Sequence, residues 1–167
     1  MMDQLTAWID RFTAWVNSLP ERPTNRAVGL LIGLPTWMVL GIAAWLTPAA
    51  QGYGTHMQLG LGGCTMLVLT GWPCPMCGMT TTFTLLAHFR FLEALVNQPF
   101  GVVLFACTVI GAVVGLVDLL TARGLYKGVL RWIGRREQLL AIGLLVGMVL
   151  GWVYKSVRMH PEVFGLS

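Results

Sequence analysis

The sequence has 167 residues and a formal net charge of +4, and 56% of its residues are hydrophobic while only 11% are charged. This length accommodates one domain, and the excess of apolar over charged residues excludes an ordinary soluble globular protein. No block of lysine and arginine interleaved with aromatic residues is present, which argues against binding to nucleic acid. Four cysteines at uneven spacing are too few for a disulfide scaffold.

Residues 1–20 form a separate N-terminal segment, in which residues 2–19 are predicted to be an amphipathic helix that Pro20 ends. Apolar residues recur there at steps of three and four and so share one helical face; they are Leu5, Trp8, Phe12, Trp15 and Leu19. Two roles fit this helix. It either lies at the membrane interface, anchored by its tryptophans, or docks on a partner protein.

Residues 21–167 are predicted to form an all-α membrane domain with three transmembrane helices. Residues 27–46 are the first span, because twenty residues at the helical rise cover about 30 Å, the thickness of the hydrocarbon core. Residues 100–120 and 139–154 are the second and third spans. Residues 47–99 lie between the first two spans and form a cysteine-rich exterior loop and helix.

Glycines four residues apart occur in each predicted span. On a helix they form a flat groove that allows another helix backbone to approach closely. We therefore expect helix packing within the chain, self-association, or contact with other membrane protein subunits. The glycines concerned are Gly29, Gly33, Gly111, Gly115, Gly143, Gly147 and Gly151.

The exterior segment is organised around a loop that carries Cys74 and Cys77, with a third thiol, Cys64, ten residues upstream. Prolines fix the backbone torsion of the loop and glycines permit sharp turns, so both loop sulfurs should point to one side. The residues expected to shape this structural loop are Gly71, Pro73, Pro75 and Gly78.

A helix over residues 80–97 is predicted to follow the loop, with a threonine such as Thr80 as its N-cap. Arg90 and Glu93 are spaced to form an ion pair on this helix. Asp118 is the one acidic residue within a predicted span, and it lies near enough to the end of that span to reach water or to pair with Arg123.

The basic residues predict the orientation in the membrane. Eight of the eleven flank one side of the spans, which the positive-inside rule assigns to the cytoplasm together with the N-terminus; they are Arg11, Arg22, Arg26, Arg123, Lys127, Arg131, Arg135 and Arg136. The cysteine loop then faces the periplasm or the exterior, where disulfides persist.

The loop and its flanks resemble a bacterial membrane-protein family known as a domain of unknown function. The resemblance covers about residues 60–155 and rests on Gly63-Cys64, Leu69-Thr70-Gly71, Cys74-Pro75-x-Cys77-Gly78-x-Thr80 and Asn97-x-Pro99. The chain differs from the family at Thr81, where the family usually has arginine, and at Gln98, inserted before Pro99. The resemblance implies a multi-pass protein of the bacterial inner membrane but no established activity.

Three interpretations of the cysteines are open. A structural metal site, such as zinc, would use Cys64, Cys74 and Cys77, with His56 or His88 as the fourth ligand. A redox dithiol would use the two loop cysteines with Cys64 as the resolving thiol. A structural disulfide would join Cys64 to one of the loop cysteines.

No Ser-His-Asp set, carboxylate pair or phosphate-binding glycine loop is present, so the sequence does not support catalysis. The sequence thus predicts a small integral membrane protein in the lipid bilayer. It would act as an accessory or scaffold subunit of a membrane complex, with a structural Cys-Pro-x-Cys-Gly loop outside. The alternative is a membrane-embedded thiol-disulfide oxidoreductase or a metal-handling protein.

Overall fold

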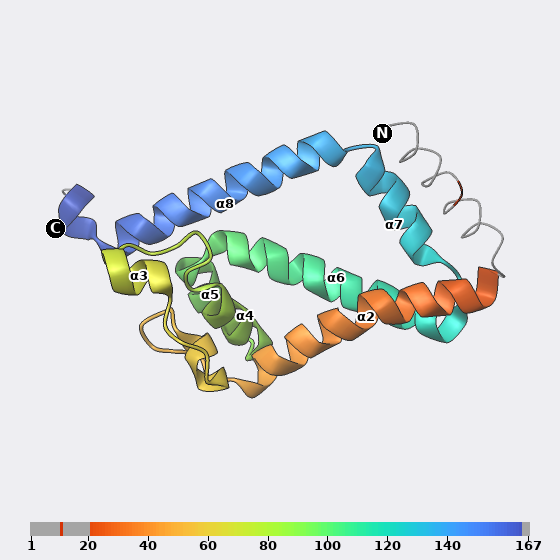
Figure 1. The fold of residues 1–167 in the computed structure, drawn as a ribbon, viewed down its shortest axis with the longest axis horizontal. Helices are drawn as coiled ribbons and strands as arrows, with labels where there is room; N and C mark the ends of the chain where they lie inside the picture. Colours follow the sequence, from red (N-terminus) through yellow and green to blue (C-terminus); the bar gives the residue numbers. More distant parts are fainter. Residues whose placement is uncertain (1–10, 12–20, 165–167) are drawn as a thin grey trace.

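The computed structural model describes residue 11 and residues 21–164, and every regular element in them is a helix (Figure 1). Three helices are long and apolar enough to cross a membrane: α2 (Glu21–Trp45), α6 (Pro99–Thr121) and α8 (Glu137–Met159). The predicted all-helical chain with three candidate spans is therefore confirmed. Apart from Arg11, the predicted amphipathic helix of residues 2–19 lies outside the described residues.

The three long helices extend beyond the predicted spans 27–46, 100–120 and 139–154, except at the end of α2, where Trp45 is the last helical residue. The difference is largest at the start of α2, which begins at Glu21, and α8 continues past its predicted end through Lys155 and Arg158 to Met159. Apolar composition marks only the part of a helix suited to the hydrocarbon core, whereas backbone hydrogen bonding continues into the polar interface.

Helices α2 and α6 pack with their backbones in contact. A Cβ atom built on Gly115 would lie 2.6 Å from Gly33 Cα, and one built on Gly29 would lie 2.6 Å from the Leu119 amide nitrogen. Gly111 faces Thr36, and a Cβ atom built on Gly111 would lie 3.3 Å from the Thr36 Cγ2 atom. Small residues thus permit a close approach that larger side chains would prevent.

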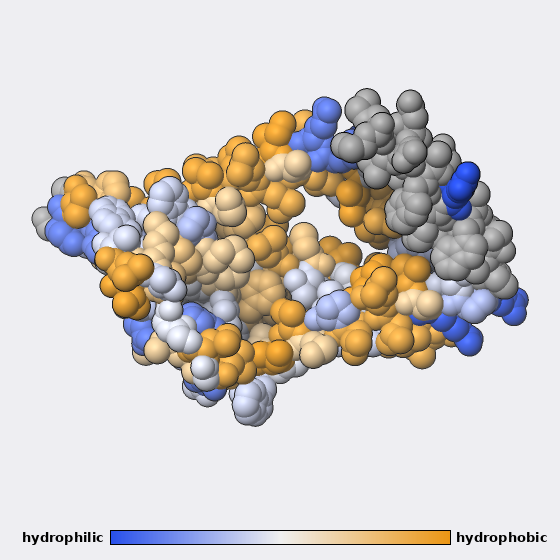
Figure 2. All heavy atoms as spheres, viewed as in Figure 1, coloured by the Kyte–Doolittle hydropathy of each residue, from blue (hydrophilic) through white to orange (hydrophobic). Residues whose placement is uncertain are grey.

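Helix α8 lies close to α6 only near the start of α6. Cβ positions on Gly147 and Gly151 would lie 2.8 Å and 3.1 Å from atoms of Phe100, whereas none of the described atoms lies within 4 Å of that position on Gly143. Figure 1 shows α8 diverging from α6 towards α7, and Figure 2 shows an opening between them. The three glycines of α8 therefore do not form one continuous contact within the described chain.

The segment between α6 and α8 contains a helix, α7 (Leu125–Gly134), where the sequence suggested only a basic loop. The buried carboxylate of Asp118 accepts hydrogen bonds from the amides of Leu125 (2.7 Å) and Tyr126 (2.8 Å), at the start of this helix. Asp118 therefore satisfies two of the amides that a helix start leaves without partners, and it does not form the ion pair expected with Arg123 among the described residues.

The segment between α2 and α6 contains η1 (Thr55–Leu59), α3 (Thr65–Thr70), α4 (Met79–Ala87) and α5 (Phe91–Asn97). The prediction of one helix over residues 80–97 is wrong, because the chain reverses at Phe89, whose φ is 61°. The reversal lets Ala94 of α5 pack against Leu85 and Leu86 of α4 in a small buried cluster. A continuous helix would keep Ala94 away from these two side chains.

Gly115→Ala should lower the free energy of unfolding by about 1–3 kcal/mol, because the added methyl group would overlap the backbone of α2. Gly143→Ala is the matched control, since it adds the same methyl group to a helix where the described chain leaves space. Unfolding by SDS in mixed micelles measures both. Equal stability of the two variants would contradict the close α2–α6 contact.

Candidate functional site

Two glycines with positive φ bound the cysteine loop. Gly71 (φ 76°) ends α3, and Gly78 (φ 87°) is the N-cap of α4. Gly78 also approaches the Gly52 carbonyl oxygen so closely that a Cβ atom would lie 2.7 Å from it. Only glycine satisfies both the torsion and the space at this position.

The predicted threonine N-cap is therefore wrong, since Thr80 lies inside α4 and no side chain caps the helix. Two neighbouring threonines face the interior and link α4 to other segments. The hydroxyl of Thr81 lies 2.8 Å from that of Thr55, and the Thr82 hydroxyl accepts a hydrogen bond from Asn97 Nδ2 (2.9 Å).

The C-terminal part of α8 and the residue that follows it hold the loop in place. Trp152 Nε1 donates to the Pro73 carbonyl (2.7 Å), and a ring nitrogen of His160 lies 3.0 Å from the Gly71 carbonyl oxygen. Pro73 itself is fully buried. The loop backbone is thus fixed by side chains more than seventy residues away in the sequence.

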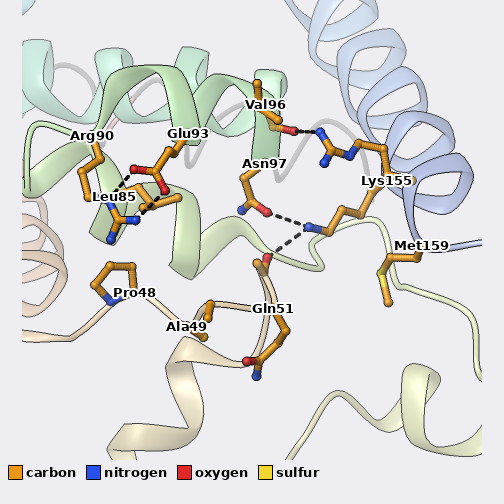
Figure 3. A pocket seen from close by; sticks show the side chains of 13 residues that line it. Pro48, Ala49, Gln51, Leu85, Arg90, Glu93, Val96, Asn97, Lys155 and Met159 are labelled. Atoms are coloured by element: carbon orange, nitrogen blue, oxygen red, sulfur yellow. Dashed lines mark hydrogen bonds and ion pairs between the residues drawn. The ribbon is translucent and has the colours of Figure 1, made fainter.

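Lys155 of α8 is the central cation of this region. Its Nζ donates to Asn97 Oδ1 (2.7 Å) and to the Gly52 carbonyl (3.0 Å), as Figure 3 shows. Asn97 in turn donates to the Gly78 carbonyl (3.1 Å). A cation therefore lies beside the start of α4 although Thr81 replaces the arginine expected there, and it comes from another helix.

Cys64, Cys74 and Cys77 line one largely apolar cavity of about 490 Å³. Cys64 and Cys74 are partly exposed, whereas Cys77 is only 5% exposed. All three are free thiols. The other lining residues include three methionines, one histidine and small or apolar residues; those with sulfur or imidazole are Met57, Met76, Met79 and His56.

Cys64 and Cys74 line the same cavity and influence each other's pKa, and the two have opposite electrostatic environments. The Leu67 backbone N–H lowers the pKa of Cys64, and the Cys74 thiol lowers it further. Burial raises the pKa of Cys74, and the neighbouring Cys64 adds to that effect. These opposite pKa directions favour the thiolate form on Cys64 rather than on Cys74.

Cys77 is the least reactive of the three thiols. Burial, followed by repulsion from Cys74 and Cys64 in their thiolate forms, raises its pKa to about 11. A thiol of this kind remains protonated at neutral pH and is a poor nucleophile.

The two histidines considered as metal ligands lie in different places. His56 lines the thiol cavity, with its Nε2 3.2 Å from the Gly62 carbonyl oxygen. His88 ends α4, and its Nδ1 lies 2.8 Å from the Thr84 carbonyl oxygen. Among the described residues, no group of three or more His, Cys, Asp or Glu side chains is arranged to hold a metal ion.

Sequence reasoning missed Trp152, Lys155 and His160 as partners of the loop. Trp152 and Lys155 fit the general pattern of aromatic and basic residues at the end of a span. Because these residues are far from the cysteines in the sequence, no local pattern indicated that they contact the loop. The Asn97-x-Pro99 segment was noticed only through the family resemblance, and its asparagine joins the loop to α8.

Alkylation should modify Cys64 first and Cys77 last when the reduced protein is treated with iodoacetamide in mild detergent. The Cys64 rate should already be high at pH values below the pKa of an ordinary cysteine, because its pKa is lowered, whereas Cys77 should react slowly up to about pH 10. Peptide mass spectrometry across a pH series gives the order. Denaturant should equalise the rates, and faster modification of Cys77 in the folded protein would refute the assignment.

A family model described as a protein of unknown function (DUF2752) matches residues 64–112, from Cys64 into α6. The match includes the thiols of Cys64, Cys74 and Cys77 and the linking Asn97. No curated protein and no solved structure matches the chain. The comparisons thus indicate similarity to an uncharacterised domain over this region.

Proposed function

We propose that this chain is a membrane-anchored thiol-disulfide exchange protein whose working pair is Cys64 and Cys74. The observation that carries the proposal is that these two thiols line the wall of one apolar cavity and shift each other's pKa in opposite directions. One thiol is partly exposed and has a lowered pKa, whereas its partner has a raised pKa. This is the arrangement that a nucleophilic thiol and a resolving thiol require.

The pair differs from the one that the Cys-x-x-Cys spacing favours. Cys77 is buried and has a raised pKa, so it is a weak candidate for attack on a substrate. Its amide donates to the Cys74 carbonyl (2.9 Å), which closes the tight turn of the loop. In the proposed mechanism Cys64 attacks and Cys74 resolves, while Cys77 has a structural role.

The reaction is an exchange with a disulfide of another protein. The Cys64 thiolate attacks one substrate sulfur, so a mixed disulfide forms and the other substrate sulfur leaves as a thiolate that takes up a proton. Cys74 then loses its proton and attacks the Cys64 sulfur, which releases the second substrate thiol. The substrate disulfide is reduced to two thiols, and the chain is oxidised to a Cys64–Cys74 disulfide. The reverse reaction oxidises a substrate dithiol.

We further propose the inner membrane of a bacterium as the location, with the thiols on the exterior side. The basic residues support this orientation, because those in the first turns of α2 and those around α7 lie at the same end of the molecule. Lys127 of α7 is 3.3 Å from Glu21, the first residue of α2. The exterior compartment of a bacterium permits disulfides to form and persist.

Equilibration of the purified protein in glutathione buffers should produce a Cys64–Cys74 disulfide while Cys77 stays reduced. Trapping with acid and alkylation, followed by peptide mass spectrometry, identifies the bridge. Cys64→Ser should abolish exchange with a disulfide-containing model peptide, and Cys74→Ser should accumulate the mixed disulfide on Cys64. Cys107→Ser is the matched control, because Cys107 lies in α6 away from the cavity, and it should leave the exchange unchanged.

The same assay on intact spheroplasts tests the orientation. A membrane-impermeant maleimide added after mild reduction should block bridge formation if the thiols face outwards.

In the glutathione assay, a bridge between Cys77 and either other cysteine, or no bridge at any glutathione ratio, would contradict the proposed exchange.

A second candidate function is an accessory or scaffold subunit of a membrane complex, and the position of α8 favours it. Helix α8 approaches α6 near Phe100 but leaves an opening towards α7 (Figure 2). Large apolar side chains such as Leu139, Ile142 and Leu145 are exposed on α8. Partner helices would cover this surface. If the cysteines never form the bridge, their loop is a structural part of such a subunit.

A further inference from the structure

A second cavity, of about 510 Å³, lies on the other side of Asn97 and Lys155 from the thiols, and its walls are polar. Figure 3 shows Arg90 and Glu93 on one side and Lys155 on the other, with the backbone at Pro48 to Gln51 between them. Arg158 belongs to the same wall as Lys155. Three cations and one carboxylate therefore surround this space.

The cavity lies where the three long helices end. The segment 48–52 follows α2, Asn97 directly precedes the Gln98 N-cap of α6, and Lys155 and Arg158 are in the last turns of α8. Trp45, the last residue of α2, is 75% exposed, as expected of a tryptophan at a membrane interface. These helix ends place the cavity at the level of lipid headgroups.

The charge in this cavity is unbalanced. Lys155 is only 5% exposed, and both of its hydrogen-bond acceptors, Asn97 Oδ1 and the Gly52 carbonyl, are neutral. Arg158 likewise donates to neutral oxygens, those of Val96 (3.1 Å) and Tyr154 (3.3 Å). No carboxylate among the described residues forms an ion pair with either side chain.

The third cation, Arg90, is already neutralised by Glu93, to which its Nε donates at 2.6 Å. The uncompensated charge is therefore that of Lys155 and Arg158 on one wall. A buried cation without a counter-charge is costly, and an anion that enters the cavity offsets this cost.

We propose that this cavity binds a phosphate group, either in the headgroup of an anionic phospholipid or as free phosphate. A tetrahedral phosphate presents several oxygens at once, which suits an ammonium group beside a planar guanidinium. The cavity also lies at the depth where phospholipid phosphates are found. This site is separate from the thiol pair, so each proposal can fail while the other stands.

Purified protein in an uncharged detergent tests the site by thermal unfolding and native mass spectrometry. The probes are inorganic phosphate, phosphatidylglycerol and phosphatidylcholine, each titrated at constant ionic strength. We expect phosphate or phosphatidylglycerol to raise the melting temperature, and Arg158→Gln to weaken the apparent affinity by about tenfold through loss of a charged hydrogen-bond donor. Lys155→Gln should weaken it at least as much.

Lys127→Gln is the matched control, because Lys127 is the only other lysine and lies on exposed α7. It should bind like the wild type. Stabilisation by phosphate alone identifies a free anion, whereas a response confined to phosphatidylglycerol identifies a lipid headgroup. The proposal is overturned if neither probe binds, or if Arg158→Gln binds both as tightly as the control. Because Arg158 contacts only exposed groups, its variant remains informative even if Lys155→Gln does not fold.

Discussion

The hydrogen bonds made by Lys155 connect the segment between α2 and α6 to the long helix α8. Through Nζ this one side chain joins α8 to Asn97 of α5 and to Gly52 of the loop after α2. Asn97 in turn donates a hydrogen bond to the carbonyl of Gly78, where the cysteine loop ends and α4 begins. Because the ammonium group of Lys155 is buried, loss of either hydrogen bond would leave a desolvated charge with fewer partners, which costs free energy. The position of the cysteine loop therefore depends on a residue almost eighty positions later in the sequence.

The two proposed sites share this connection. Asn97 and Lys155 line the polar cavity, whereas Gly78, which Asn97 contacts, lines the thiol cavity. The polar cavity carries the unbalanced positive charge of Lys155 and Arg158, and the apolar cavity is lined by the three thiols. Trp152 and His160 hold the loop independently at Pro73 and Gly71, so the loop is fixed along its length. Such support fixes the backbone on which Cys74 is placed beside the cavity that Cys64 also lines.

Local sequence patterns predicted the features that depend on residues close together in the chain. Apolar runs indicated the three long helices, and the i,i+3 spacing indicated the Arg90–Glu93 pair. The reversal at Phe89 was not predictable, because it depends on the burial of Ala94 against residues of the preceding helix. Helix α7 was missed because its start is completed by Asp118, which the sequence presents only as an acid in a span. The pairing of Cys64 with Cys74 was one of several that the sequence left open, since spacing favours Cys74 with Cys77.

The central claim is that Lys155 positions the cysteine loop, and hydrogen–deuterium exchange of the loop amides tests it most directly. Lys155→Met keeps a long side chain but removes the charge and its donors, and Lys127→Met is the matched control on exposed α7. Peptides covering residues 72–82 should exchange faster in Lys155→Met than in the wild type and the control, while α2 and α6 keep their protection. Unchanged protection of the loop in Lys155→Met would contradict the account.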